Sequence, residues 1–281
     1  MNPILIITAL SMCLVGCTKL DQRPQVVELE NAASKESANQ RAGAVSSLVI
    51  PAAALIPDLQ TVIPQHLQVV NEHQHDLLRF SNGIANTGVG ALQFKPEFPL
   101  GDNTVGTQNA VQQLLDASGI IVFEETVSEF EYHPEHHHWH IEAVALFEVR
   151  KDSPTGSVVG GNSIKTTFCL IDWIKLNDNS NSKERMYFDC FGELQGISPG
   201  WVDQYNQAVE GQELDITGVA EGTYYLVSTA NPDHTFIETN NNNNTAWVSF
   251  DLKRDKQGHP KIFVTGHSSC TGGLCGYSPN R

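Results

Sequence analysis

Apolar and polar side chains alternate in short segments along most of this chain, from about residue 55 onward. IPDLQTVIPQHLQVV and HDLLRFSNGIANTGVGALQF are two examples, and turns rich in Gly and Asn separate such segments. A period of two directs one face of a strand toward a core and the other toward solvent. Long runs rich in Leu, Ala, Glu and Lys are absent from the sequence. The pattern predicts a mainly β fold with many short strands, few short helices and long loops.

The second half of the chain contains further expected strands. IEAVALFEVRKD and SIKTTFCLID each predict one strand, and residues 222–254 predict two strands around a polar loop, as in a β-sandwich hairpin. The loop holds the asparagine run 240–244, which we expect to be solvated because asparagine tolerates turn conformations. One short helix is expected over residues 110–115. Together these segments predict a β-sandwich-like domain over residues 55–281.

The first 54 residues follow a different pattern. MNPILIITALSMCLVGCTKL holds an apolar run too short to span a bilayer, ending at Leu14-Val15-Gly16-Cys17. A small residue before a cysteine is typical of a bacterial lipoprotein signal. We therefore expect residues 1–17 to form a signal peptide with its lipobox, lipid on Cys17 to anchor the protein to a bacterial membrane, and the mature chain to be extracytoplasmic. The alternative is an ordinary secretory signal with an incidental cysteine. Residues 18–54 are polar and lack periodicity, which predicts a disordered tether.

The chain is strongly acidic. It has 17 Lys and Arg against 32 Asp and Glu, which gives a formal net charge of -15. We expect no nucleic-acid partner, because contacts to phosphates need clustered basic residues. An acidic surface attracts cationic substrates weakly, and it also keeps a secreted protein soluble.

Four cysteines remain once the leader is removed and Cys17 is lipidated: Cys169, Cys190, Cys270 and Cys275. An even number outside the cytoplasm indicates two disulfides. Cys270 and Cys275 enclose only TGGL and could close a small loop, which would leave the other two to pair. Spacing alone leaves the connectivity open.

The stretch HPEHHHWHIE, residues 133–142, holds five of the eleven histidines. His136, His138 and His140 lie at alternate positions, so an extended chain directs them to one side and Trp139 to the other. A flat strand would spread the outer two too far apart, and we expect a bend near Pro134. Three imidazoles suit Cu(II), Zn, Ni or Fe(II), and three protein ligands leave a position open for catalysis.

The histidine stretch has two other interpretations. The stretch can be a solvated histidine-rich patch with incidental metal affinity. A helical pair of His133 with His137 is also conceivable, although the flanking segments are strand-like. Neither explains three alternating histidines followed directly by an apolar strand.

With the histidine stretch and the segments given below, the chain resembles the lysyl oxidase family of copper-dependent amine oxidases over about residues 55–250. QGISPG followed by Asp-x-Tyr, downstream of His-x-His-x-His, is a specific combination. The segments that carry the resemblance are Ile56-Pro57-Asp58-Leu59, Asn86-Thr87-Gly88, the histidine stretch, Lys165 to Asp172, Gln195 to Gly200, Asp203-Gln204-Tyr205 and Leu214 to Thr217.

The resemblance implies a mainly β, β-sandwich-like catalytic domain and an activity. Copper would be held by His136, His138 and His140. Lys165 and Tyr205 would be cross-linked into lysine tyrosylquinone. The protein would then use dioxygen to oxidise primary amines, either peptidyl lysine or small amines, to aldehydes, with release of ammonia and hydrogen peroxide. Asp203 and Asp172 are candidate polar neighbours, although surface or turn positions are expected for both, and the catalytic base is unassigned.

The chain also departs from the family. Glu135 stands where the animal enzymes have a cysteine, and the usual partners of Cys169 and Cys190 are missing, so the resemblance predicts that these two pair with each other. The tail after about Lys253 matches poorly, and His259 and His267 within it are expected at the surface.

Two functions of other classes remain open. One is an extracytoplasmic copper- or zinc-binding protein of the same fold, without quinone or oxidase activity. The other is an adhesive β-sandwich whose histidines are incidental.

Overall fold

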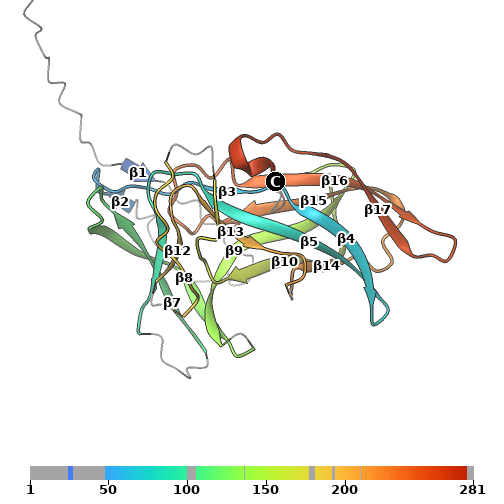
Figure 1. Cartoon of the computed structure of the whole chain (residues 1–281), viewed down its shortest axis with the longest axis horizontal. Coiled ribbons are helices and arrows are strands. Elements are labelled where there is room, and N and C mark those ends of the chain that lie inside the picture. The colour runs from blue at the N-terminus through green and yellow to red at the C-terminus, as the bar shows by residue number, and fades with distance from the viewer. Residues whose placement is uncertain are drawn as a thin grey trace, which may run out of the picture.

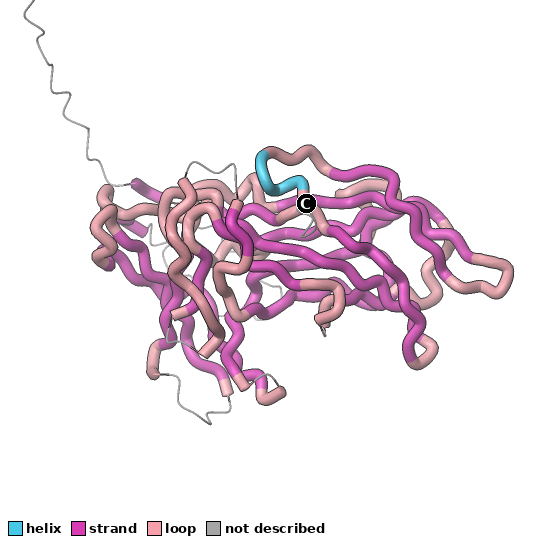
Figure 2. Tube along the Cα trace, viewed as in Figure 1, coloured by secondary structure: helices cyan, strands magenta, loops and turns pink. Residues whose placement is uncertain are grey.

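The computed structural model describes residues 25–27, 48–99, 106–135, 137–176, 181–191, 194–209 and 211–276. The side chains of residues 25–27, 161–166 and 272 lie outside the described part. Nearly all regular structure in the described part is β-strand, as Figures 1 and 2 show. The one helical element there is a 3-10 turn, η1 (Gly272–Cys275). The mainly β prediction is therefore confirmed.

The strands, in chain order, are β1 (Gln25–Val27), β2 (Leu48–Ile50), β3 (Leu59–Thr61), β4 (Gln65–Glu72), β5 (His75–Asn86), β6 (Leu92–Pro96), β7 (Thr107–Leu115), β8 (Ile121–His133), β9 (His138–Lys151), β10 (Val158–Phe168), β11 (Ile174–Lys175), β12 (Gln195–Ile197), β13 (Trp201–Tyr205), β14 (Glu213–Asp215), β15 (Gly222–Ala230), β16 (Thr245–Arg254) and β17 (Pro260–His267).

Two antiparallel sheets build the domain, and each is organised by one long strand. The larger sheet runs in the order β12-β6-β7-β8-β9-β15-β16-β17, and β10 also pairs with β9. The smaller sheet runs in the order β11-β13-β5-β14, with β3 and β4 also on β5. β9 pairs with β8 at its first residues and with β10 and β15 further along, so one strand carries three partners. In Figure 1, β7 and β8 run steeply against β15 and β16, which shows the strong twist of the larger sheet.

The two sheets pack face to face through a shared apolar core. Phe80 of β5 and Phe147 of β9 meet edge to face, with ring centroids 4.9 Å apart. A polar contact also crosses the interface, because the hydroxyls of Thr61 on β3 and Ser228 on β15 are 2.7 Å apart. The predicted β-sandwich-like arrangement is confirmed by these contacts.

The prediction of a helix over residues 110–115 is wrong, since this segment forms the end of β7. Ala110, Gln112 and Leu114 alternate inward, and all three are fully buried. The Gln112 side chain bonds both the carbonyl and the amide of Ile237, at 2.9 and 2.8 Å. A buried glutamine therefore occupies an inward position of the strand. Because an apolar residue is expected there, the sequence did not show the alternation typical of a strand.

The expected tether over residues 18–54 is ordered in part. β1 and β2 form a small antiparallel pair, and Ile50 is fully buried beside Ile56, Leu114 and Ile237. The packed domain therefore begins at or before residue 48, not at residue 55. The rest of the tether, the signal segment and Cys17 lie outside the described residues. No helix in the described part of the chain is long and apolar enough to cross a membrane.

The asparagine run is solvated only in part. Asn240 and Asn242 are exposed, as expected, but Asn244 is buried. The Asn244 side chain donates to Glu238 at 2.7 Å and to the carbonyl of Ala230 at 3.1 Å. Burial of Glu238 raises its pKa, and hydrogen bonds from Asn231 and Asn244 oppose this rise. The loop is thus anchored to the core at its end.

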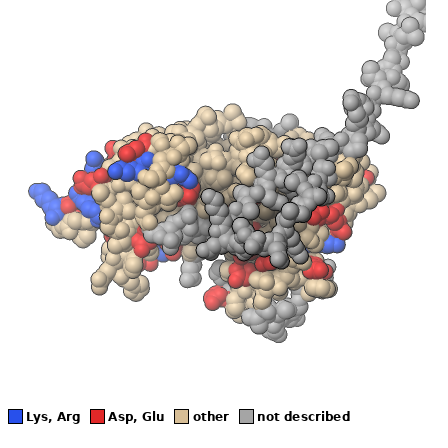
Figure 3. All heavy atoms as spheres, turned by 180° about the vertical axis from the view of Figure 1, so that it is seen from behind, with Lys and Arg blue, Asp and Glu red and all other residues tan. Residues whose placement is uncertain are grey.

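Charge is unevenly distributed over the surface. On the face shown in Figure 3, most Lys and Arg lie at one end, mixed with acidic residues. This is the end where β4, β16 and β17 lie in Figure 1. Among the charged side chains drawn at the opposite end of the same face, most are acidic.

Removing the Phe147 ring tests how far the two sheets depend on each other. Phe147→Ala should lower the free energy of unfolding by about 3–5 kcal/mol, since it empties a fully buried site between the sheets. Phe263→Ala on β17 is the matched control, because this ring is 57% exposed, and its effect should stay within about 0.5 kcal/mol. Urea unfolding followed by fluorescence measures both, and equal losses would contradict the shared core.

Candidate metal centre

The histidine stretch forms the tip of the β8–β9 hairpin. β8 ends at His133 and β9 begins at His138, and these two residues are paired across the strands. The turn between them contains Pro134, which has a restricted φ, and His137, which adopts a left-handed φ of 57°. The expected bend is therefore present. His136 lies outside the described residues and stays a predicted ligand.

His138 and His140 direct their imidazoles toward the same point. Their Nε2 atoms are 2.9 Å apart, because residues two positions apart on β9 lie on the same face of the strand. Trp139 between them is buried on the other side, edge to face with Tyr132 at 5.4 Å. The alternation predicted for these three residues is confirmed.

The surroundings of His140 fit a metal-binding imidazole. Its Nδ1 lies 3.2 Å from the Thr167 hydroxyl of β10, which leaves Nε2 toward His138. Metal-bound histidines commonly use one ring nitrogen as the ligand and hold the other in a hydrogen bond that fixes the ring. Imidazole donors in this arrangement suit copper or zinc. The residues present therefore fit the predicted metal.

His133 belongs to the same cluster, a role that the sequence pattern did not reveal. Its ring stacks on His140 with centroids 4.0 Å apart, and its Nε2 is 3.4 Å from the Thr167 hydroxyl. The helical pairing of His133 with His137 is wrong, because His133 ends a strand and His137 lies in the turn. Strand pairing across a tight turn after His133 was the signal that could have placed it beside His138.

A disulfide lies directly beside these histidines. Cys169 and Cys190 are bonded, with a S–S distance of 2.05 Å, as the resemblance predicted. A ring nitrogen of His138 and both sulfurs lie within 4.8 Å of one another. The sulfurs are oxidised and are therefore not thiolate ligands. Cys270 and Cys275 form the second disulfide, close to the last residue that the structure describes.

Tyr205 is held by the main chain of Cys169. Its hydroxyl donates to the Cys169 carbonyl and accepts from the Cys169 amide, both at 3.1 Å. Its ring packs on Phe168, with centroids 4.1 Å apart. Burial of the hydroxyl, followed by the charge of Asp203, raises the pKa of Tyr205 well above its usual value. Tyr205 is therefore a neutral phenol at ordinary pH before any modification.

One stretch of chain connects Tyr205 to the histidines. Thr167 contacts His140 and His133, and Cys169, two residues later, holds Tyr205. Lys165 lies in β10 two residues before Thr167, with its backbone opposite Leu146. The side chain of Lys165 is outside the described part, so its place beside Tyr205 stays a prediction.

Asp172 and Asp203 are buried, so the surface or turn positions expected for them are wrong. Asp172 accepts hydrogen bonds from the Ser198 amide at 2.7 Å and from its hydroxyl at 2.6 Å. The amides of Met186 and Tyr187 donate to the same carboxylate, at 2.8 and 3.1 Å. Ser198, directly after β12, and the 186–187 main chain thus surround the Asp172 carboxylate. Only the folded chain brings these donors together.

Asp203 is the less well-compensated of the two carboxyls. Burial raises its pKa well above 3.8, the negative charge of Asp172 raises it further, and hydrogen bonds from the Ile171 and Gln204 backbone oppose the rise. One carboxyl oxygen, Oδ2, has no hydrogen-bond partner among the described residues. Asp203 therefore holds its proton more tightly than an exposed aspartate does.

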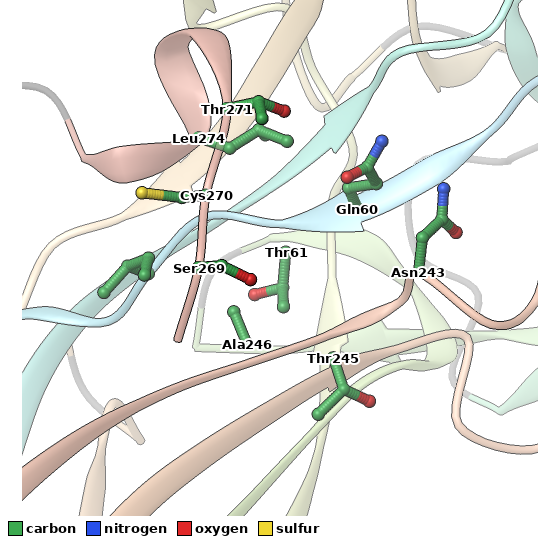
Figure 4. Close-up of a pocket in the computed structure, with 10 residues that line it drawn as sticks. Gln60, Thr61, Asn243, Thr245, Ala246, Ser269, Cys270, Thr271 and Leu274 are labelled. Atoms are coloured by element: carbon green, nitrogen blue, oxygen red, sulfur yellow. The ribbon is translucent and has the colours of Figure 1, made fainter. Parts of the chain in front are cut away.

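A cavity of about 280 Å³ lies elsewhere in the fold, between β3, the start of β16 and the C-terminal segment (Figure 4). Polar side chains, the apolar Ile63, Ala246 and Leu274, and the Cys270 end of the second disulfide line it. None of its ten lining residues belongs to the histidine cluster. The cavity is therefore separate from the candidate metal centre.

Comparisons with known proteins agree with the geometry. The family model described as lysyl oxidase matches residues 117–259. Protein-lysine 6-oxidase of Sus scrofa is 29% identical over 151 residues, which are 53% of this chain and 53% of that protein. The Bos taurus protein of the same name is also 29% identical over 151 residues, but these cover 31% of its length. Lysyl oxidase homolog 1 of Homo sapiens is 34% identical over 116 residues, or 41% of this chain and 19% of that protein. The chain thus spans about half the length of the first relative and less of the others.

The raised pKa of Asp203 predicts a pH-dependent loss of stability. The folded state binds the proton more tightly than the unfolded state, so its contribution is complete below pH 3.8 and is lost as the pH rises through the folded-state pKa. The stability of the metal-free wild type should therefore fall relative to Asp203→Asn between pH 4 and pH 8, in urea unfolding. Glu124→Gln is the control, because hydrogen bonds from Lys95 and Gln113 lower the pKa of Glu124, and its difference from wild type should be constant above about pH 5. A constant difference for Asp203→Asn would contradict its buried, uncompensated position.

The two disulfides should differ in their contribution to stability, because they close loops of different length. Cys169 and Cys190 are 21 residues apart, and Cys270 and Cys275 are 5 apart. The loop-entropy relation gives losses of about 3 kcal/mol for the Cys169→Ser, Cys190→Ser double variant and about 2 kcal/mol for the Cys270→Ser, Cys275→Ser pair. Urea unfolding of the two double variants compares them directly, and a larger loss for the shorter loop would refute the relation here.

Proposed function

The chain belongs to the lysyl oxidase family, and from this premise we propose that it is a copper- and quinone-dependent amine oxidase acting on primary amines. The observation that best supports the proposal is the Thr167 to Cys169 stretch. It contacts His140 on one side and holds the Tyr205 hydroxyl on the other. A metal at the histidines and a modified tyrosine would thus share one supporting segment.

His136, His138 and His140 would hold the copper, and Lys165 and Tyr205 would form lysine tyrosylquinone. Bound copper would support the oxidation of the tyrosine ring by dioxygen. The resulting quinone would be the electron sink for amine oxidation. The net reaction converts RCH2NH2, O2 and H2O into RCHO, NH3 and H2O2. The substrates would be protein lysines or small amines, since the relatives include proteins named protein-lysine 6-oxidase.

Three groups of this protein would act in that reaction: the Thr167 hydroxyl, the main chain of Cys169 and the Asp203 carboxyl. Thr167 orients His140 by bonding its Nδ1, so that Nε2 is directed to the ligand position. The main chain of Cys169 fixes the Tyr205 hydroxyl at 3.1 Å from both of its polar groups, which limits rotation of the ring. Asp203 is the buried carboxyl near Tyr205 that can take up a proton at Oδ2, and its raised pKa brings it closer to the range in which a general base is effective.

An alternative function is metal binding without a quinone. The contacts among His133, His138, His140 and Thr167 support it, because none of them depends on Lys165. Such a protein would bind copper or zinc and leave Lys165 and Tyr205 unmodified. Covalent chemistry at these two residues distinguishes the two functions.

The test is mass spectrometry of the domain expressed with copper in air. A peptide containing Lys165 cross-linked to Tyr205, with the added mass of phenylhydrazine after treatment, is the expected result. Lys165→Ala and Tyr205→Phe should each abolish the cross-link and reduce amine turnover at least about 10³-fold, because the electron sink is lost. Copper content should stay near that of the wild type.

Lys175→Ala and Tyr225→Phe are the matched controls. Lys175 is exposed and lies over the Trp201 ring, while Tyr225 packs on Trp247 of β16. Both variants should keep the cross-link and the turnover. Unmodified peptides from copper-loaded wild type would overturn the oxidase and favour the metal-binding function.

A further inference from the structure

The segment from Trp173 to Leu194 contains several exposed large apolar side chains, and one of them, Phe191, contacts the candidate metal centre. Phe191 is 72% exposed, more than any other large apolar residue in the part of the chain that the structure describes. Trp173, Met186, Phe188 and Leu194 are also exposed in this segment. Exposed apolar groups gathered in one place commonly mark a binding surface.

These side chains face outward because the segment is anchored inward. Tyr187 is buried and donates its hydroxyl to Gln93 at 2.8 Å, while its amide donates to Asp172 at 3.1 Å. In an extended chain the neighbours of an inward residue point outward, and Met186 and Phe188 do so. Cys190 is then tied to Cys169 by the disulfide. Phe191 therefore follows a residue that is covalently fixed beside the site.

Phe191 is in direct contact with the histidine cluster. Its ring meets the ring of His138 edge to face, with centroids 5.8 Å apart and an angle of 83° between the planes. Phe188 differs, because the Arg185 guanidinium lies over its ring at 4.9 Å. Of the two phenylalanines, Phe191 is thus the one continuous with the site.

Charge beside Phe191 suits a cationic ligand. The Asp189 carboxylate accepts a hydrogen bond from the Phe191 backbone amide at 2.9 Å, which places an acidic group close to the main chain of Phe191. Glu131 places a second carboxylate 3.6 Å from His133. An ammonium group bound near the histidines would have anionic neighbours, while the rest of the molecule could lie on the phenylalanine ring.

We propose that Phe191 forms a binding subsite for the apolar body of the amine substrate. The subsite selects primary amines whose aminomethyl carbon carries an aryl or other bulky apolar group, over short alkyl amines. The inference rests on the proposed function for the identity of the ligand. The apolar body packs on the Phe191 ring while the amine carbon is directed past His138 toward Tyr205.

Equilibrium binding to the Tyr205→Phe protein tests the subsite without turnover. The ligands are 4-fluorobenzylamine, followed by fluorine NMR, and ethylamine, followed by its displacement of the fluorinated ligand. An aromatic contact contributes about 0.5–1.5 kcal/mol, so adding Phe191→Ala should raise the Kd of fluorobenzylamine about two- to tenfold. The Kd of ethylamine should change less than about twofold, because it does not reach the ring.

Matched variants separate a lost contact from a disturbed site. Phe191→Tyr should retain binding of the aryl amine, because it keeps the ring. Phe263→Ala removes another exposed phenylalanine, on β17, and should leave both affinities unchanged. Copper content and the Cys169–Cys190 disulfide, measured in each variant, should match the wild type. A parallel loss of affinity for both amines in Phe191→Ala would overturn the subsite.

Steady-state kinetics of the copper-loaded enzyme distinguish this inference from the proposed function. Phe191→Ala should raise KM for benzylamine and leave kcat, and both constants for ethylamine, near wild type. A wild type that oxidises neither amine contradicts the oxidase, while the NMR affinities still report on the subsite. A wild type that oxidises both, with no change in either KM on Phe191→Ala, overturns the subsite alone. Concentration-dependent dimerisation lost in Phe191→Ala, with amine affinities unchanged, would also overturn it and assign the ring to contact between two copies.

Discussion

The double hydrogen bond between Tyr205 and the main chain of Cys169 is the interaction on which the arrangement of the site depends. A buried phenol needs a partner for its hydroxyl, and the amide and carbonyl of one residue supply both a donor and an acceptor. Cys169 is itself fixed by its disulfide and follows the strand that bears Thr167. The smaller sheet, which contributes Tyr205, is thereby tied to the larger sheet, which contributes the histidines.

Burial of acidic groups under this point gives the site its electrostatic character. Asp172 is compensated by four hydrogen bonds, three of them from main-chain amides. Asp203 has fewer hydrogen bonds, and burial, followed by the negative charge of Asp172, raises the pKa of Asp203. An uncompensated carboxyl is costly to bury, so its retention is easier to understand at a reactive centre than in an ordinary core. Burial, followed by the charge of Asp203, also raises the pKa of Tyr205.

The disulfide connects chemistry with recognition. In this chain Cys169 and Cys190 pair with each other, and the Phe191 ring, next in the chain, lies against His138. A different pairing would have placed Phe191 elsewhere. The exposed Phe191 ring, the disulfide and the histidine cluster therefore lie next to one another through His138.

The sequence by itself determined the fold class and the alternation of His138, Trp139 and His140, because both follow from the period of two in a strand. It also pointed to Cys169–Cys190 through resemblance. Only the tertiary structure decided that His133 joins the cluster, that Asp172 and Asp203 are buried and that residues 110–115 form a strand. Each of these depends on a partner distant in the sequence: Thr167 for His133, Ser198 for Asp172 and the Ile237 backbone for Gln112. A periodic pattern predicts which face of a strand a side chain occupies. It does not predict which distant residue will contact that face.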